Sequence, residues 1–203
     1  MQASIKVAVI YHSGYGHTAK QAEAVAAGAA SAPNTISTLI PVADIDQHWA
    51  ALESYDAIIF GAPTYMGSAS APFKAFMDAT SGTVFAKGAV WKDKIAAGFT
   101  NSASRSGDKL ATLQQFAIFA AQHGMHWVNL GLPPGHNSSV TTEEALNRHT
   151  YFLGAGAQSD ADTGPDAGAT PSDLKTSAHL GRRVATVALE IAVGRQALKL
   201  TAL

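Results

Sequence analysis

Apolar residues along the chain follow two alternating patterns, which predict strands and helices in turn. Residues 5–11, IKVAVIY, are almost continuously apolar, as is typical of a strand buried on both faces of a parallel sheet. Residues 18–30 instead place their apolar side chains on one helical face. The same patterns predict strands at 35–42, 55–63, 93–102 and 125–131, and helices at 44–52, 72–79, 108–123 and 172–197, the last with Ser172 as N-cap. This alternation predicts an α/β fold with helices on both faces of a parallel sheet.

One long segment, residues 132–171, departs from this regularity and is rich in Gly, Pro, Ser and Asp. A loop of this length inside a compact domain is usually functional or mobile. Within it, HTYFLGAG at 149–156 is expected to return briefly to the edge of the sheet. For a chain of 203 residues we expect a single domain over 1–203, with this segment as a surface excursion.

Composition excludes several classes of function. With 14 basic and 15 acidic residues the formal net charge is −1, which supplies no basic surface for nucleic acid or a membrane. The chain has no Cys, so we expect neither disulfides nor a thiolate metal site, and the spacing of its His residues matches no metal motif. No apolar run predicts a signal peptide or a membrane span. A cytoplasmic protein without a metal is the expectation.

The loop after the first strand, HSGYGHT at 12–18, has the chemistry of a phosphate site. Gly14 and Gly16 permit close backbone approach, Ser13 and Thr18 offer hydroxyl groups, and the following helix directs unpaired N–H groups at the loop. The loop lacks the Gly-Lys-Ser/Thr of a nucleoside-triphosphate site and the G-x-G-x-x-G of a dinucleotide site. A tight turn that needs glycine for geometry alone is the alternative interpretation.

Two further loops strengthen the phosphate interpretation. In a sheet with strand order 2-1-3-4-5, ligands bind beyond the carboxyl ends of the strands at the switch in order. The loops that leave the first, third and fourth strands, at 12–18, 61–70 and 100–108, are all small, polar and glycine-bearing. Together they suit a flat aromatic ligand that is anchored by a phosphate at one end.

These motifs also carry a family resemblance. The segments YHSGYGHT, YDAIIFGAPTYMGSASAPFKAFMDAT and QHGMHWVNLG, in this order, resemble the flavodoxin-like superfamily, and within it the WrbA-type NAD(P)H:quinone oxidoreductases, which bind FMN. The resemblance implies a three-layer α/β/α fold with a five-stranded parallel sheet of order 2-1-3-4-5. It also implies a hydride transfer from NADPH or NADH through the flavin to a quinone by a ping-pong mechanism. The flavin carries this chemistry, so no catalytic side chain is expected.

The resemblance assigns cofactor-binding residues segment by segment. For the flavin phosphate these are Ser13, Gly14, Tyr15, Gly16, His17 and Thr18; along the flavin ring they are Pro63, Thr64, Tyr65, Met66, Gly67, Asn101, Ser102, Ala103, Ser104, Arg105, Ser106 and His123. Phe85 stands where the family has a Trp that covers the flavin from a neighbouring subunit. Arg105 adds a positive charge to a loop that is glycine-rich in the family. Tyr15, Phe85 and Arg105 are therefore the predicted nicotinamide and substrate pocket.

Two other functions are also consistent with the sequence. A flavodoxin-type electron carrier is one, although a net charge of −1 gives little field for docking. A binding module that kept the fold and lost the flavin is the other, suggested by NSASRSG at 101–107. The family resemblance also implies a homodimer or homotetramer, in which Phe85 and the excursion at 132–171 complete the pocket of the next subunit.

Overall fold

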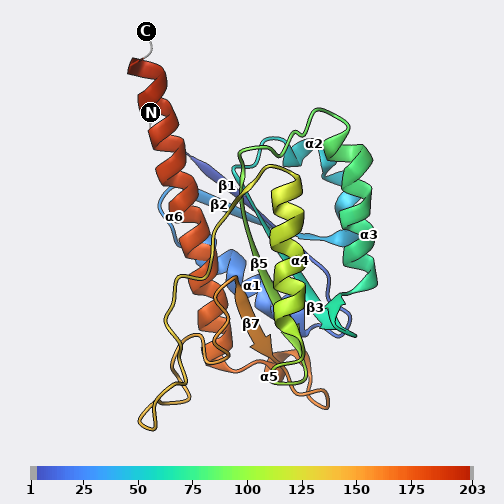
Figure 1. The fold of residues 1–203 in the computed structure, drawn as a ribbon, viewed down its shortest axis with the longest axis vertical. Helices are drawn as coiled ribbons and strands as arrows, with labels where there is room; N and C mark the ends of the chain where they lie inside the picture. Colours follow the sequence, from blue (N-terminus) through green and yellow to red (C-terminus); the bar gives the residue numbers. More distant parts are fainter. Residues whose placement is uncertain (1–3, 202–203) are drawn as a thin grey trace.

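The computed structural model describes residues 4–201, with side chains over 4–198, and contains a twisted sheet between two layers of helices (Figure 1). The strands of the sheet are β1 (Ile5–Tyr11), β2 (Thr35–Pro41), β3 (Ala57–Tyr65), β4 (Ser68–Ala69), β5 (Ile95–Ser102), β6 (His126–Trp127) and β7 (Ala155–Gln158). The main path runs β2-β1-β3-β5-β6, with each neighbouring pair parallel. This is the predicted order of five strands, but the prediction of only five strands is wrong, because β4 pairs with β3 and β7 pairs with β5.

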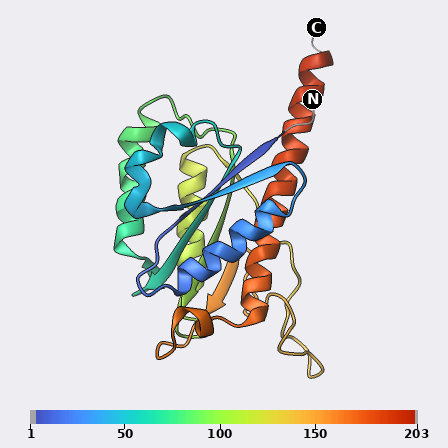
Figure 2. The same cartoon turned by 180° about the vertical axis from the view of Figure 1, so that it is seen from behind.

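Helices cover both faces of this sheet. They are α1 (His17–Ala30), a 3₁₀ helix (Val42–Gln47), α2 (Trp49–Leu52), α3 (Ala71–Thr80), a π-helical turn (Ser81–Phe85), α4 (Lys109–Gln122), α5 (Pro165–Gly168) and α6 (Pro171–Thr201). One core lies between the sheet and the pair α1 and α6, and a second core, rich in Phe side chains, lies between the sheet and α3 and α4. Seen from behind, α1 and α6 lie side by side, and the C-terminal part of α6 projects past the sheet (Figure 2).

Among the predicted boundaries, the end of β3 and the start of α6 differ as follows. The strand expected to stop at residue 63 continues to Tyr65 and returns as β4, with Tyr65 opposite Ser68. Met66 and Gly67 between them both have positive φ, 48° and 83°, as the tightest hairpin turns require. The last helix begins at Pro171 rather than after Ser172, and the Ser172 hydroxyl donates to Ala145 O instead of capping the helix.

The strand predicted at 125–131 is shortened to β6, because the chain leaves β5 after two residue pairs and pairs with it again only at β7. β6 pairs with Ile95 and Ala96 only, and β7 pairs with the far half of β5, from Phe99 to Ser102. Between the two pairings, a Cβ at Gly154 would stand 2.0 Å from Gly98 O. Only glycine permits this crossing, so the fifth strand is split in two and the excursion leaves from the gap.

The segment 132–171 is therefore less irregular than predicted. Its return to the sheet edge is confirmed, but as β7 at Ala155–Gln158, which overlaps the predicted 149–156 only at its end. The segment also contains the short helix α5. Both lie at the end of the molecule where the parallel strands finish (Figure 1). Within the described residues, no helix combines the length and apolar character needed to cross a bilayer.

Candidate functional site

A cavity of about 400 Å³ opens at the carboxyl ends of β1, β3, β5 and β7. Its lining comes from Ser13, Tyr15, His17, Thr18, Pro63, Tyr65, Asn101, Ser102, Ala103, Ser159 and Ala161. All of these except Ser159 and Ala161 are among the residues predicted to bind a cofactor. The fold thus brings together the three predicted loops. The lining has no Asp, Glu, Lys or Arg side chain, and hydroxyl, amide and imidazole groups supply its polarity.

The loop before α1 presents the N–H groups of a helix N-terminus to this cavity. Gly16 is the N-cap, with φ at 88°, and has no side chain that could accept from the first turn. The Ser13 hydroxyl accepts from Ala19 N–H at 3.1 Å, which leaves its own O–H free to donate. Thr18 lines the cavity although only 2% of its surface is exposed. The first turn of α1 contains no acidic residue, so no carboxylate of this helix opposes an anion here.

The end of the long excursion closes the outer side of this loop. A Cβ at Gly16 would stand 2.4 Å from Pro165 Cγ in α5. His17 Nε2 lies 2.9 Å from Thr163 O, and since a carbonyl only accepts, this nitrogen carries the proton. Lys20 and Asp166 form an exposed ion pair at 2.9 Å beside these contacts. The cradle is therefore built from two segments that are almost 150 residues apart in sequence.

Two tyrosines stand at the mouth of the cavity. The rings of Tyr15 and Tyr65 meet edge to face with centroids 6.4 Å apart, and 77% of Tyr15 is exposed. A Cβ at Gly14 would stand 2.7 Å from the Tyr65 hydroxyl oxygen. Burial, and next the neighbouring Tyr15, raise the pKa of Tyr65 above its usual value of 10, so its phenol stays protonated at neutral pH.

The remaining predicted residues of the loop at 61–70 are either buried in the fold or exposed at its hairpin turn. Thr64 is buried, and its hydroxyl lies 2.8 Å from that of Thr100 and 2.7 Å from that of Thr112. Because Thr100 donates to Ala62 O, the chain of donors runs from Thr112 through Thr64 to Thr100. Met66 is fully exposed at the hairpin turn beside Gly67. Thr64, Met66 and Gly67 do not line the cavity.

The loop after β5 is held from behind by a buried lysine. Lys109 has no exposed surface, and its Nζ donates to Ser104 O at 2.7 Å, Arg105 O at 2.9 Å and Ser106 O at 3.4 Å. Tyr151 Oη donates to Ser106 O as well, at 2.8 Å. Burial lowers the pKa of Lys109 to about 8, so the ammonium form predominates at pH 7. The ammonium thus fixes the path of three consecutive carbonyl groups in this loop.

Asn101 connects that loop to a residue missed by the sequence analysis. Its Nδ2 donates to Ser159 Oγ at 2.8 Å, and both side chains are buried at the cavity. Ser159 and Ala161 come directly after the end of β7, and Asn101 and Ser102 are the last residues of β5, so both pairs lie at the same edge of the sheet. The signal was present in HTYFLGAG, since a strand returning at 149–156 must also finish in a loop at the same edge of the sheet.

Five further predicted residues lie outside the cavity. Arg105 and Ser106 line a separate polar cavity, and Ser104 is exposed between the two. His123 and Phe85 line a third cavity, at the far end of α4. A helix of 14 residues is about 21 Å long, so His123 lies roughly that far from the loop that Lys109 holds. Its predicted contact with a flavin therefore requires a second copy of the chain and stays a prediction.

His123 has a defined protonation state. Thr80 Oγ1 donates to Met77 O, so His123 Nε2, 2.9 Å from Thr80 Oγ1, must be the donor of that pair. Its Nδ1 is buried and has no hydrogen-bond partner among the described residues. Burial lowers the pKa of His123, which keeps the imidazole neutral.

A phosphate monoester with an attached ring fits the first cavity. Neutral hydroxyl groups and a helix N-terminus form one end, and the ring side is walled by Pro63, Tyr65 and Ala103. Gly14 and Gly16 let Tyr65 and Pro165 lie against the loop, where an added Cβ would clash with them. FMN has this combination of groups, and its phosphate would lie at residues 13–18.

Known proteins are similar to this chain over most of its length. Residues 32–134 match the family model described as NADPH-dependent FMN reductase. The chain is 43% identical to flavodoxin FldP of Pseudomonas aeruginosa, over 92% of its own length and 98% of that protein, and 32% identical to an NAD(P)H dehydrogenase (quinone) of Caulobacter vibrioides, over 92% and 98%. A crystal structure of a flavodoxin, WrbA-like protein from Agrobacterium tumefaciens superposes with a TM-score of 0.71 at 42% identity, covering 92% of this chain and 99% of that one.

Proposed function

Since the chain belongs to the NADPH-dependent FMN reductase family and is a WrbA-like protein of flavodoxin fold, we propose that it is an FMN-dependent NAD(P)H:quinone oxidoreductase. The observation that carries this proposal is the neutral polar cavity at the ends of β1, β3, β5 and β7. Three loops and the α5 segment converge there around the N-terminus of α1. Such a site suits a phosphate at one end and a flat ring at the other.

The residues of this chain have separate duties in the proposal. Ser13 and Thr18, with the N–H groups of the first turn of α1, would hold the phosphate, and Pro165 closes that end. Lys109 keeps the loop at 101–106 in place, and backbone N–H groups of that loop would stabilise negative charge on the ring. The exposed ring of Tyr15 would meet the incoming nicotinamide or quinone. When bound, FMN supplies the two-electron redox chemistry.

The face of the flavin ring that the first cavity would leave open is the feature that favours an enzyme with alternating substrates. Tyr15 at the mouth meets Tyr65 edge to face and is largely exposed, so it leaves room for a second ring. We propose that the nicotinamide and the quinone use this face one after the other, which gives ping-pong kinetics.

An electron carrier is the second candidate function. It is favoured by the similarity to flavodoxin FldP, which is 43% identical over nearly the full length of both proteins. A carrier exchanges electrons with protein partners and does not need to turn over NADPH with a small acceptor. Its weak point in this chain is the formal net charge of −1, which gives little electrostatic steering toward a partner.

Steady-state turnover separates these functions. FMN-loaded protein is mixed with NADPH or NADH and a soluble benzoquinone, and nicotinamide oxidation is followed by its absorbance. The enzyme proposal requires many turnovers for each protein and parallel lines in double-reciprocal plots at several quinone concentrations. A flavin that binds but is not reduced by either nicotinamide would instead support the carrier, and protein that does not take up FMN would support a flavin-free module.

A further inference from the structure

A second polar cavity, of about 350 Å³, borders the loop that follows β5. It is lined by Arg105, Ser106, His136, Arg148, His149 and Tyr151. No carboxylate is in the lining, and Arg105, Ser106 and Arg148 have N–H or O–H groups that can face a ligand. The side chains of His136, His149 and Tyr151 already contact Thr142 O, Asp173 and Ser106 O. Paired arginines beside a hydroxyl group are groups that proteins use to bind phosphate or carboxylate.

One of the two arginines is rigidly placed. Arg148 donates from Nε to Asp173 Oδ1 at 2.8 Å and from Nη2 to Asp173 Oδ2 at 3.0 Å. The side chains of Arg148 and Asp173 are 8% and 1% exposed, and His149 Nε2 lies 3.2 Å from the same carboxylate. This bidentate pair fixes the plane of the guanidinium and leaves Nη1 for the cavity. The charge of Asp173 offsets that of Arg148.

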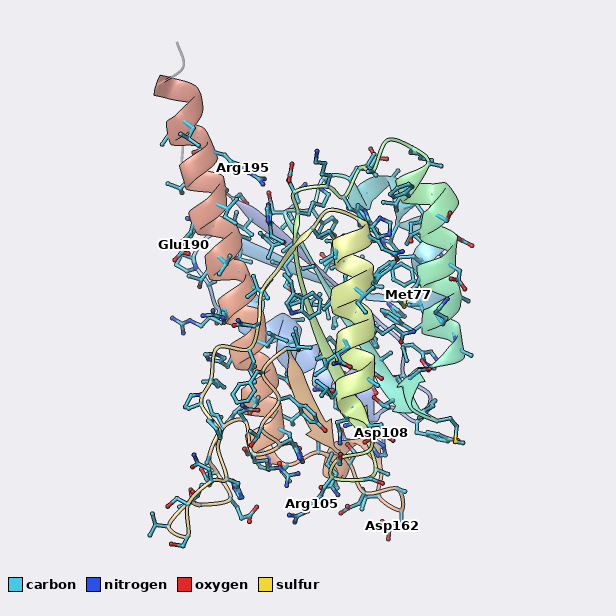
Figure 3. The ribbon with its side chains drawn as sticks, in the orientation of Figure 1. Met77, Arg105, Asp108, Asp162, Glu190 and Arg195 are labelled. Atoms are coloured by element: carbon cyan, nitrogen blue, oxygen red, sulfur yellow. The ribbon has the colours of Figure 1, made fainter. Side chains whose placement is uncertain are left out.

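The other arginine supplies the uncompensated charge. Arg105 is exposed, and its guanidinium has no ion pair or hydrogen bond within the described part of the chain. Its side chain projects from the end of the molecule where the parallel strands finish (Figure 3). The guanidinium groups of Arg105 and Arg148 and the single carboxylate of Asp173 leave one uncompensated positive charge at this cavity, whereas the first cavity has no Asp, Glu, Lys or Arg in its lining.

The backbone below Arg105 is fixed although its side chain is not. Lys109 Nζ donates to Arg105 O at 2.9 Å, and Tyr151 Oη donates to the next carbonyl, Ser106 O, at 2.8 Å. Ala103, two residues earlier in the same loop, lines the first cavity. One short and well-held segment therefore borders both cavities, so a single extended ligand can reach both.

We propose that this second cavity binds the 2′-phosphate of NADPH, with Arg105 as the residue that distinguishes NADPH from NADH. This inference rests on the proposed function. A phosphate monoester carries close to two negative charges at pH 7, and a guanidinium binds it through two parallel N–H donors. NADH has a hydroxyl group at the same position and gains nothing from the charge. The nicotinamide end of the same molecule would lie at the first cavity, beside Tyr15.

Calorimetry on FMN-loaded protein tests the cavity without any turnover. The ligands are adenosine 2′,5′-bisphosphate and adenosine 5′-monophosphate, and the variants are Arg105→Gln and, as a matched control, Arg182→Gln, which removes the same charge from an exposed site on α6. The bisphosphate should bind the parent protein and the Arg182 variant about ten-fold more tightly than the monophosphate. The Arg105 variant should lose that preference.

Three results would overturn the assignment. The first is equal affinity of the parent protein for both nucleotides, and the second is a preference that survives Arg105→Gln. Inorganic phosphate is tested as a competitor, and the third result is displacement of the bisphosphate at matching concentration, which would show a general phosphate site instead of a nucleotide site.

Kinetics then separate this inference from the proposed function. In the Arg105→Gln variant, the ratio of kcat/KM for NADPH to kcat/KM for NADH should fall about ten-fold. Parent protein that oxidises neither nicotinamide would refute the proposed function, while the nucleotide calorimetry would still decide the cavity. Equal losses for NADPH and NADH would refute the role of Arg105 while leaving the reductase activity intact.

Discussion

The ring of Pro165 lies against Gly16 so closely that a Cβ added at position 16 would stand 2.4 Å from Pro165 Cγ. Gly16 is the N-cap of α1 and Pro165 begins α5, so this contact joins the first loop of the chain to the end of the long excursion. The excursion is therefore part of the site.

Substitution of Gly16 by Ala should lower the free energy of unfolding by about 2–4 kcal/mol, because strain at positive φ adds to a clash with Pro165. Gly67→Ala is the matched control, since Gly67 has φ at 83° but nothing within 4 Å of its added Cβ, and it should lose only about 1–2 kcal/mol. Urea denaturation measures both. The double variant Gly16→Ala/Pro165→Ala should recover the difference, and equal losses in the two single variants would contradict the contact.

Removal of the buried ammonium in Lys109→Met should change how stability depends on alkaline pH. Burial lowers the pKa of Lys109 to about 8 from 10.5, so between these values the unfolded chain binds more protons than the folded one. Stability of the parent protein relative to the variant should therefore rise with pH from about 8 to 10, by about 1.4 kcal/mol per pH unit at most. Lys87→Met, at an exposed position, should run parallel to the parent protein, and a parallel curve for Lys109→Met would refute the buried ammonium.

A dependence of the same sign, but at acid pH, is expected for Asp173. Burial, the largest influence, raises its pKa, but hydrogen bonds from His149, Arg148 and Gln158 N–H outweigh it and hold the pKa below 3.8. This contribution is present above the unfolded pKa and is lost as pH falls through the lower folded value. Asp173→Asn should cost about 3–5 kcal/mol at pH 7 and less below pH 4, as measured by urea denaturation.

The matched control for Asp173 is Asp78→Asn, which removes an exposed ion pair with Lys74 and should cost no more than about 1 kcal/mol. A loss for Asp173→Asn that stayed constant down to pH 3 would show that the ion pair does not carry the effect.

Assembly into a homodimer or homotetramer is expected from the surroundings of Phe85. This ring is 56% exposed and lies beside His123 in a cavity of about 300 Å³ at the far end of α4. Phe85→Asp should lower the sedimentation coefficient toward that of a monomer, whereas Val193→Asp, at an exposed position on α6, should leave it unchanged. A parent protein that sediments as a monomer with full activity would refute the assembly.

The sequence predicted the repeating α/β elements well, because their signals are local. Continuous apolar runs give β1 at Ile5–Tyr11 with no error, and helical periodicity gives α1 within one residue. The three loops at 12–18, 61–70 and 100–108 could also be placed at one edge, since parallel strands end on the same side.

Features that depend on contacts distant in sequence were not predictable in the same way. The split of the fifth strand follows from the contact of Gly154 with Gly98 O, and nothing local to either glycine indicates it. Ser159, Ala161 and Pro165 join the site because β7 lies beside β5; HTYFLGAG indicated a returning strand but not which strand it would pair with. In the sequence, Lys109 resembles any lysine in the first turn of a helix. Only the three-dimensional structure shows that it is buried beneath three carbonyl groups.

Titration of flavin-stripped protein with FMN, followed by flavin fluorescence, tests the central claim most directly. Thr18→Val is compared with Thr186→Val, because both replace a helical Thr at constant shape but only Thr18 lines the first cavity. The parent protein and the Thr186 variant should quench FMN at a one-to-one ratio, and the Thr18 variant should bind about ten-fold more weakly. No binding by the parent protein, or undiminished binding by Thr18→Val, would contradict a flavin held by its phosphate at residues 13–18.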